Sequence, residues 1–88
     1  MSKIVVWNIE RATHNGPKDN YTKQPVDICY SEEAARIKLK NSIAAYCEQF
    51  DDPVIDDSHP DDVLVYNTPT SKYPYTEFWL YSAVVQEA

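Results

Sequence analysis

The sequence predicts an α+β fold in which a three- or four-stranded antiparallel sheet packs on one long helix. A segment with helical spacing of apolar residues lies between segments rich in β-branched and aromatic residues. The last two of these segments are joined by a short turn with a proline at each end, which is typical of a β-hairpin. Because 88 residues suffice for only one domain, we expect a single α+β domain over residues 1–88, in the order β-(β)-α-β-β.

The first strand is expected at residues 3–10, KIVVWNIE. Its apolar residues fall on both faces, which is typical of a central strand that is covered on both sides. Residues 11–25 are polar and contain Asn-Gly-Pro, which indicates a loop or a wide turn. Residues 26–31 form either a short strand or an extended lead into the next element, and both alternatives stay open.

The helix is expected at residues 31–50. Ser31 is a good N-cap, because its side-chain oxygen can accept from a free amide of the first turn. Glu32 and Glu33 lie favourably at the positive end of the helix dipole. The chain should leave the helix before Pro53, since proline disfavours helical geometry in the preceding residue. Six residues of this segment form one apolar stripe: Ala35, Leu39, Ile43, Tyr46, Cys47 and Phe50.

The two strands of the hairpin are expected at residues 63–68 and 75–85. Alternation in the second of them divides its side chains between the two faces of the sheet. One helix covers only one face, so the other should be covered by the 11–25 loop, by a partner or by a second copy of the chain. One face should carry Phe78, Leu80 and Val84, and the other Tyr75, Glu77, Trp79, Tyr81 and Val85, together with Val5, Trp7 and Ile9.

The net charge of −6 comes from one segment. Residues 51–62, DDPVIDDSHPDD, contain six aspartates and no lysine or arginine; we call this segment the acidic strip. The eight other acidic residues are balanced by the eight lysines and arginines of the chain. This distribution disfavours binding to nucleic acid or to an anionic membrane and is compatible with a basic patch on a partner protein.

The acidic strip has three interpretations. It can be a solvated connection between helix and strand, a surface that contacts lysine and arginine on a partner, or a loose divalent-cation site. The spacing does not match a calcium-binding EF-hand loop, because the strip has no glycine and no closing glutamate. A loose cation site would use four side chains: Asp56, Asp57, His59 and Asp61.

The sequence has no recognisable catalytic signature, so we expect neither an enzyme nor a cofactor or metal. The only histidines, His14 and His59, fall in predicted loops. Cys47 lies on the apolar stripe of the helix, and Cys29 is interpreted as a packed thiol rather than a reactive one. A single glycine cannot build a phosphate-binding loop. Without a signal sequence or membrane span, and with two cysteines read as reduced thiols, a cytoplasmic protein is expected.

The sequence therefore predicts a non-enzymatic interaction module or small inhibitor that binds a basic surface of a partner protein. One version, suggested by composition, is a viral or phage antagonist that occupies a nucleic-acid-binding surface of a host-defence machine. The alternatives are a homodimeric or larger structural assembly that pairs through the open sheet face, and a small metal- or ligand-binding domain. Nine residues are expected to contact the partner: Asp51, Asp52, Asp56, Asp57, Asp61, Asp62, Tyr75, Trp79 and Tyr81.

Overall fold

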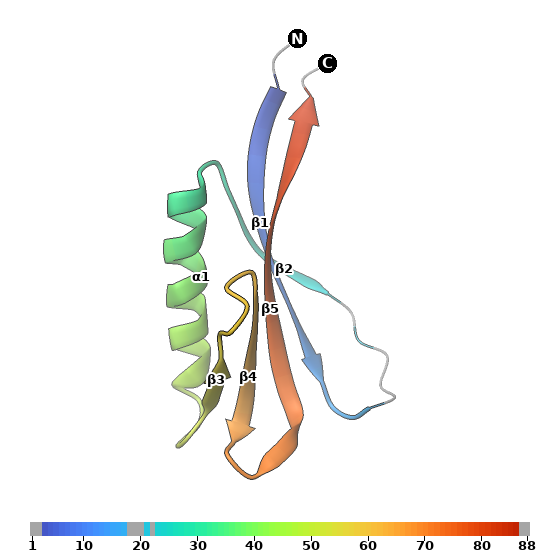
Figure 1. Cartoon of the computed structure of the whole chain (residues 1–88), viewed down its shortest axis with the longest axis vertical. Helices are drawn as coiled ribbons and strands as arrows, with labels where there is room; N and C mark the ends of the chain where they lie inside the picture. The colour runs from blue at the N-terminus through green and yellow to red at the C-terminus, as the bar shows by residue number, and fades with distance from the viewer. Residues whose placement is uncertain (1–2, 18–20, 22, 87–88) are drawn as a thin grey trace.

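One helix packs against one face of a five-stranded antiparallel sheet in the computed structural model, which describes residues 3–17, 21 and 23–86 (Figure 1). The strand order in the sheet is β2-β1-β5-β4-β3. The α+β class is confirmed, with five strands in place of the three or four expected. The elements are β1 (Lys3–His14), β2 (Gln24–Cys29), α1 (Glu32–Cys47), β3 (Val54–Asp56), β4 (Asp62–Thr68) and β5 (Ser71–Gln86).

The two long strands β1 and β5 form the centre of the sheet. Their register runs without a break from Lys3↔Gln86 to His14↔Tyr75, so β1 extends four residues into the segment expected to be a loop. The alternative of a strand after this loop is the correct one, because β2 pairs with β1. β5 begins at Ser71, earlier than expected, which leaves only two residues between it and the end of β4.

The helix begins as its sequence predicts and ends three residues earlier. The Ser31 hydroxyl accepts from the amide of Ala34 at 3.1 Å, which caps the first turn. After the C-cap of the helix, the backbone hydrogen bonds join residues three apart instead of four. The amide of Phe50 donates to the Cys47 carbonyl at 3.1 Å. Three residues of the expected apolar stripe are buried against the sheet: Ala35, Leu39 and Ile43.

The hydrophobic core fills the layer between α1 and the sheet. Phe78 and Leu80 point into it, as alternation along β5 predicts, and Phe78 is completely buried. The face expected for Val5, Trp7 and Ile9 was wrong, because β1 pairs these residues with Val84, Ser82 and Leu80 of β5. Ile9 pairs with Leu80 across β1 and β5, and directly opposed residues of paired strands point to the same face. Ile9 is therefore completely buried in the core, and Trp7 packs against the same cluster.

Beyond the body of the sheet, β1 and β5 continue as a two-stranded ribbon toward one end of the molecule (Figure 1). β2 accompanies β1 only over Trp7–Arg11, and β4 accompanies β5 only as far as Trp79. The ribbon contributes to the elongated shape of the protein, whose principal extents are 51 × 27 × 21 Å.

Candidate functional site

Four aspartates of the acidic strip lie exposed around the edge strand β3. Asp51 and Asp52 occupy the turn between α1 and β3, Asp56 is the last residue of β3, and Asp57 follows it. None of the four forms an ion pair with a lysine, arginine or histidine in the part of the chain that the structure describes. Two hydrogen bonds from Ser58, at 2.7 and 3.2 Å, lower the pKa of Asp56. Within the described residues, this edge of the molecule therefore presents exposed negative charge that no basic side chain pairs with.

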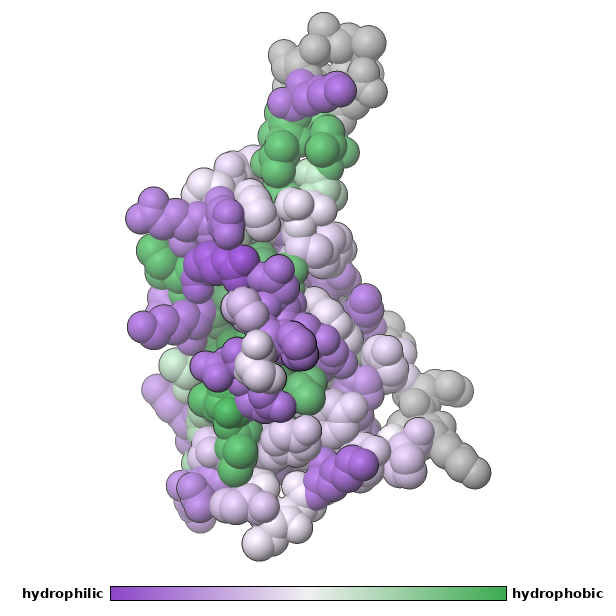
Figure 2. Space-filling model, in the orientation of Figure 1, coloured by the Kyte–Doolittle hydropathy of each residue, from purple (hydrophilic) through white to green (hydrophobic). Residues whose placement is uncertain are grey.

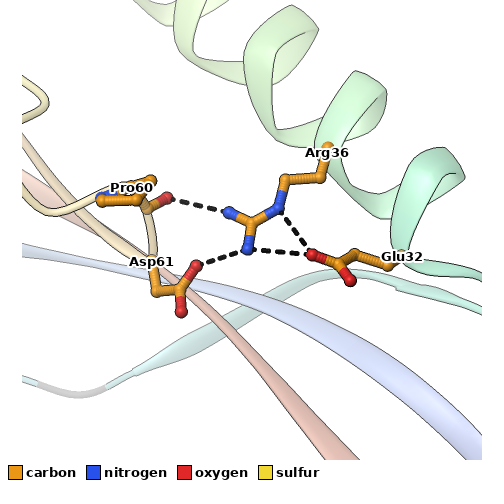
Figure 3. Close-up of polar contacts among 4 residues, drawn as sticks. All are labelled: Glu32, Arg36, Pro60 and Asp61. Carbon is orange, nitrogen blue, oxygen red and sulfur yellow. Dashed lines mark hydrogen bonds and ion pairs between the residues drawn. The ribbon is translucent and has the colours of Figure 1, made fainter.

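The fifth aspartate, Asp61, attaches the strip to the helix (Figure 3). The Arg36 guanidinium lies 2.7 Å from an Asp61 oxygen and 3.2 Å from an oxygen of Glu32, one turn earlier on α1. Arg36 also donates to the carbonyl of Pro60 at 3.3 Å. These contacts hold the loop before β4 against the helix, so Asp61 has a structural partner within the chain.

A groove of about 440 Å³ lies between α1 and the strands β3 and β4. Ile55 enters it from the middle of β3 and is 46% exposed, because β3 is the last strand of the sheet and pairs only with β4. Charged side chains of both signs also line the groove: Arg36, Lys40 and Asp57. The apolar part of its lining comes from Leu39, Ile43, Ala44, Ile55, Pro60 and Val63. The groove thus joins an open strand edge, an apolar surface and the acidic strip.

On the opposite face of the sheet, aromatic rings surround a histidine and a carboxyl group. His14 stacks on Tyr75 with ring centroids 4.6 Å apart, and Tyr21 approaches His14 to 4.1 Å. Tyr21 also stacks near Trp79, and the ammonium of Lys23 lies 4.6 Å from the centre of the Trp79 ring. Tyr21 and Lys23 belong to residues 11–25, the segment that was one of the three expected covers of this face. This segment therefore covers part of the face.

Glu77 is the carboxyl group at the centre of this face. Its Oε1 lies 3.1 Å from Nε2 of His14, and the two side chains are only 14% and 11% exposed. Burial, together with the hydrogen bond and the charge repulsion of the neighbouring Asp62 carboxyl, raises the pKa of Glu77 from 4.5 to about 7. Asp62 has a buried oxygen without a hydrogen-bond partner, and a protonated Glu77 is a suitable donor for an Asp62 oxygen.

The structure separates the nine residues expected to contact a partner into two groups. Four aspartates surround β3 and Asp61 adjoins them, whereas Asp62 and the aromatic residues lie on the face opposite the helix. Tyr75 and Trp79 are partly covered there, and Tyr81 is exposed where the ribbon begins. Sequence reasoning missed the groove and the His14–Glu77 contact. The contact has no local signal, because the β1–β5 register brings together two residues 63 positions apart.

The structure also bears on the two cysteines and on the loose cation site expected in the acidic strip. Cys29 and Cys47 are free and pack against the core, and burial raises the pKa of Cys47. Within residues 3–17, 21 and 23–86, no three His, Cys, Asp or Glu side chains are grouped so that they could hold a metal ion. In the same part of the chain, no helix is both long enough and apolar enough to cross a membrane.

Comparison of the chain with protein-family models, with curated proteins and with solved structures finds no match. The features that bear on function are therefore those of the chain itself. They are the aspartates without a basic partner in the described residues, the open edge of β3 and the groove beside it.

Proposed function

We propose that the protein is a non-enzymatic interaction module that binds an extended, basic segment of a partner protein between α1 and the edge of β3. One observation carries the proposal: exposed aspartates without a basic partner in the described chain flank an open strand edge that borders an apolar groove. Each of these features is common by itself. Their coincidence at one edge favours a binding role for the acidic strip over that of a solvated connection.

The backbone of the partner segment would pair with β3. The outer edge of an edge strand carries unpaired amides and carbonyls, and an extended peptide can add to it as a further strand. A helix that lies beside such an edge provides a surface against which side chains of the added strand can pack. In this protein that surface is the part of α1 around Leu39 and Ile43.

Side chains would set the specificity for a basic segment. Along an added strand, alternate side chains point to the groove and away from it. An aliphatic side chain suits the apolar lining formed by Leu39, Ile43 and Ile55. Lysine or arginine side chains nearby would meet Asp56 and Asp57, and the concentrated negative charge would accelerate association at low salt.

The negative charge of the acidic strip supports a more specific function, that of an inhibitor of a nucleic-acid-binding protein. A basic segment that binds the phosphates of a nucleic acid would also bind the carboxylates of the acidic strip. The protein would then compete with nucleic acid for that segment, as expected of a small viral or phage antagonist of a host-defence protein.

The test uses random extended peptides displayed on phage and selected on the full chain. We expect enrichment of peptides with lysine or arginine on both sides of an aliphatic residue. Against the best synthetic peptide, Asp51→Asn/Asp52→Asn/Asp57→Asn should raise Kd about tenfold, since each exposed charge pair contributes roughly 0.2–1 kcal/mol. Ile55→Lys should weaken binding as well, because it places a cation in the groove.

Glu33→Gln is the matched control. Glu33 is an exposed carboxylate on the first turn of α1, outside the acidic strip, and should leave Kd unchanged. Selected peptides that bind the triple variant and the wild type with equal affinity would overturn the proposal. Selection of neutral or acidic peptides alone would overturn it too.

A further inference from the structure

The ribbon at the end of the molecule carries several exposed apolar side chains. We define the ribbon as residues 3–6 of β1 and residues 81–86 of β5. Val84 is 63% exposed and Val85 48%, and Val5 and Tyr81 are exposed as well. Figure 2 shows a contiguous hydrophobic area on this ribbon. An apolar ribbon of two strands has little stability in water by itself, so its surface is suited to an interface.

Both edges of the ribbon also lack strand neighbours in the described chain. β2 ends its pairing with β1 at Trp7, and β4 ends its pairing with β5 at Trp79. The β1 edge is short and begins with Lys3, and an edge lysine hinders the addition of another strand. The β5 edge has no charged residue and no proline from Phe78 to Gln86. Of the two, the β5 edge is therefore the one suited to further pairing.

The direction of the free amides follows from one hydrogen bond. The amide of Leu80 donates to the Asp61 carbonyl at 2.9 Å, so it faces the side of the sheet on which β4 lies. Successive amides of a regular strand alternate between its two edges, and the β1–β5 register continues without a break to Gln86. The amides of Ser82 and Val84 therefore face the same side as that of Leu80, beyond the end of β4.

We propose that this edge pairs with the same edge of a second copy, so that the two sheets join into one through antiparallel β5 strands. A twofold axis near Ala83 would place each free amide opposite a free carbonyl of the partner, which makes the edge self-complementary. The absence of charge from Phe78 to Gln86 removes like-charge repulsion at the contact. Pairing would also cover Val84 and Val85 of each copy.

The distribution of charge favours a second copy at this end. All of the net charge of −6 is in the acidic strip, and β3 lies toward the end of the molecule opposite the ribbon (Figure 1). A dimer through the ribbon would keep the two acidic strips apart and exposed. If the acidic strip binds a partner as proposed above, the dimer would be bivalent; the dimer itself does not depend on that function.

The test is sedimentation velocity of the full chain over a range of concentrations. The contact spans about six residues per strand, roughly 20 Å, which is small for a protein interface. We therefore expect a weak dimer with a dissociation constant on the order of 10 μM. Val84→Lys should raise the dimer Kd at least tenfold, because it places a charge on the apolar edge strand. Ser82→Pro should do the same by removing one outward amide while leaving the pairing with β1.

Ile37→Lys is the matched control, because Ile37 is an apolar residue of comparable exposure, 56% against 63% for Val84, on the helix. It should leave dimerisation unchanged. A wild-type chain that stays monomeric to about 300 μM, some thirty times the expected Kd, overturns the proposal. A dimer that both ribbon variants retain also overturns it and would direct attention to the face around Trp79.

Hydrogen exchange keeps the proposal testable if the variants fold poorly. In the wild-type protein, the amides of Ser82 and Val84 should exchange more slowly as the protein concentration rises, since they enter hydrogen bonds only in the dimer. Exchange at these two amides that is independent of concentration, in a sample that does dimerise, would place the interface elsewhere.

Discussion

The two faces of the sheet are held by different interactions. The face toward α1 is a continuous apolar core in which Ile9, Val65 and Phe78 are completely buried. The opposite face is a layer of aromatic rings around His14 and Glu77, covered in part by Tyr21. Apolar burial contributes stability that does not depend on pH, whereas the second face contains a carboxyl group that titrates near neutrality.

The difference suggests a division of roles. A small chain with one helix can build only one dry layer, and this layer determines most of its stability. The second face uses wide aromatic side chains, which bury much area per residue while their polar atoms stay close to water. The second face should therefore tolerate substitution better and respond more to solution conditions.

The largest expected difference is between neighbouring residues of β5. Phe78→Ala should lower the free energy of unfolding by about 3–5 kcal/mol, because it leaves a cavity in the core. Trp79→Ala, on the opposite face and partly exposed, should cost about 1–2 kcal/mol. Urea unfolding followed by circular dichroism measures both.

The comparison of Phe78 with Trp79 would be contradicted by equal losses of stability in the two variants. If Phe78→Ala does not fold, Phe78→Leu gives the same ordering at smaller cost, since most of the core volume is retained.

A smaller and pH-dependent difference should come from Glu77. Its carboxyl group has a pKa of about 7 in the folded protein and an ordinary value of 4.5, so between these pH values the folded chain keeps a proton that the unfolded chain releases. This contribution makes stability fall as the pH rises from 4.5 to about 7. Glu77→Gln, whose amide oxygen can still accept from His14, should be more stable than the wild type at pH 8 by on the order of 1–2 kcal/mol, after allowance for solvent screening.

Urea unfolding of the wild type and Glu77→Gln at acid and alkaline pH tests this expectation. The two proteins should differ little near pH 4.5, where the carboxyl is protonated in the folded chain. Glu33→Gln controls for the loss of an exposed carboxylate. A constant difference between the wild type and Glu77→Gln at every pH would mean that Glu77 does not titrate as described.

The smallest loss of stability is expected from substitution of Tyr21, which covers part of the second face. Tyr21→Ala removes the contacts with His14 and Trp79 and should lower the free energy of unfolding by about 0.5–1.5 kcal/mol, the range of an aromatic pair. Tyr21→Phe keeps the ring and should be nearly neutral. Indole fluorescence of Trp79 offers a second readout, although Trp7 must first be replaced by Phe to isolate its signal.

A Tyr21→Ala variant as destabilised as Phe78→Ala would remove the proposed distinction between the faces, because the cover would then be part of the core.

Local patterns in the sequence determined the parts of the fold that depend on neighbours along the chain. The Ser31 cap and the stripe of Ala35, Leu39 and Ile43 specify the helix, because side chains one turn apart share a face. Alternation along β5 correctly assigned Phe78 and Leu80 to one face. The sequence also located the whole net charge in the connection between the helix and the hairpin.

The order of the strands and their register depend on contacts between distant parts of the chain, which local patterns do not specify. Alternation says that Ile9 and Asn8 face opposite sides but not which side meets the helix; the pairing of Ile9 with Leu80 decides it. The same register brings His14 to Glu77, and the sheet order leaves β3 and the ribbon with open edges. Strand pairing joins residues far apart in the chain, and its energy depends on the whole sheet, whereas helix caps and periodicity act within a few residues.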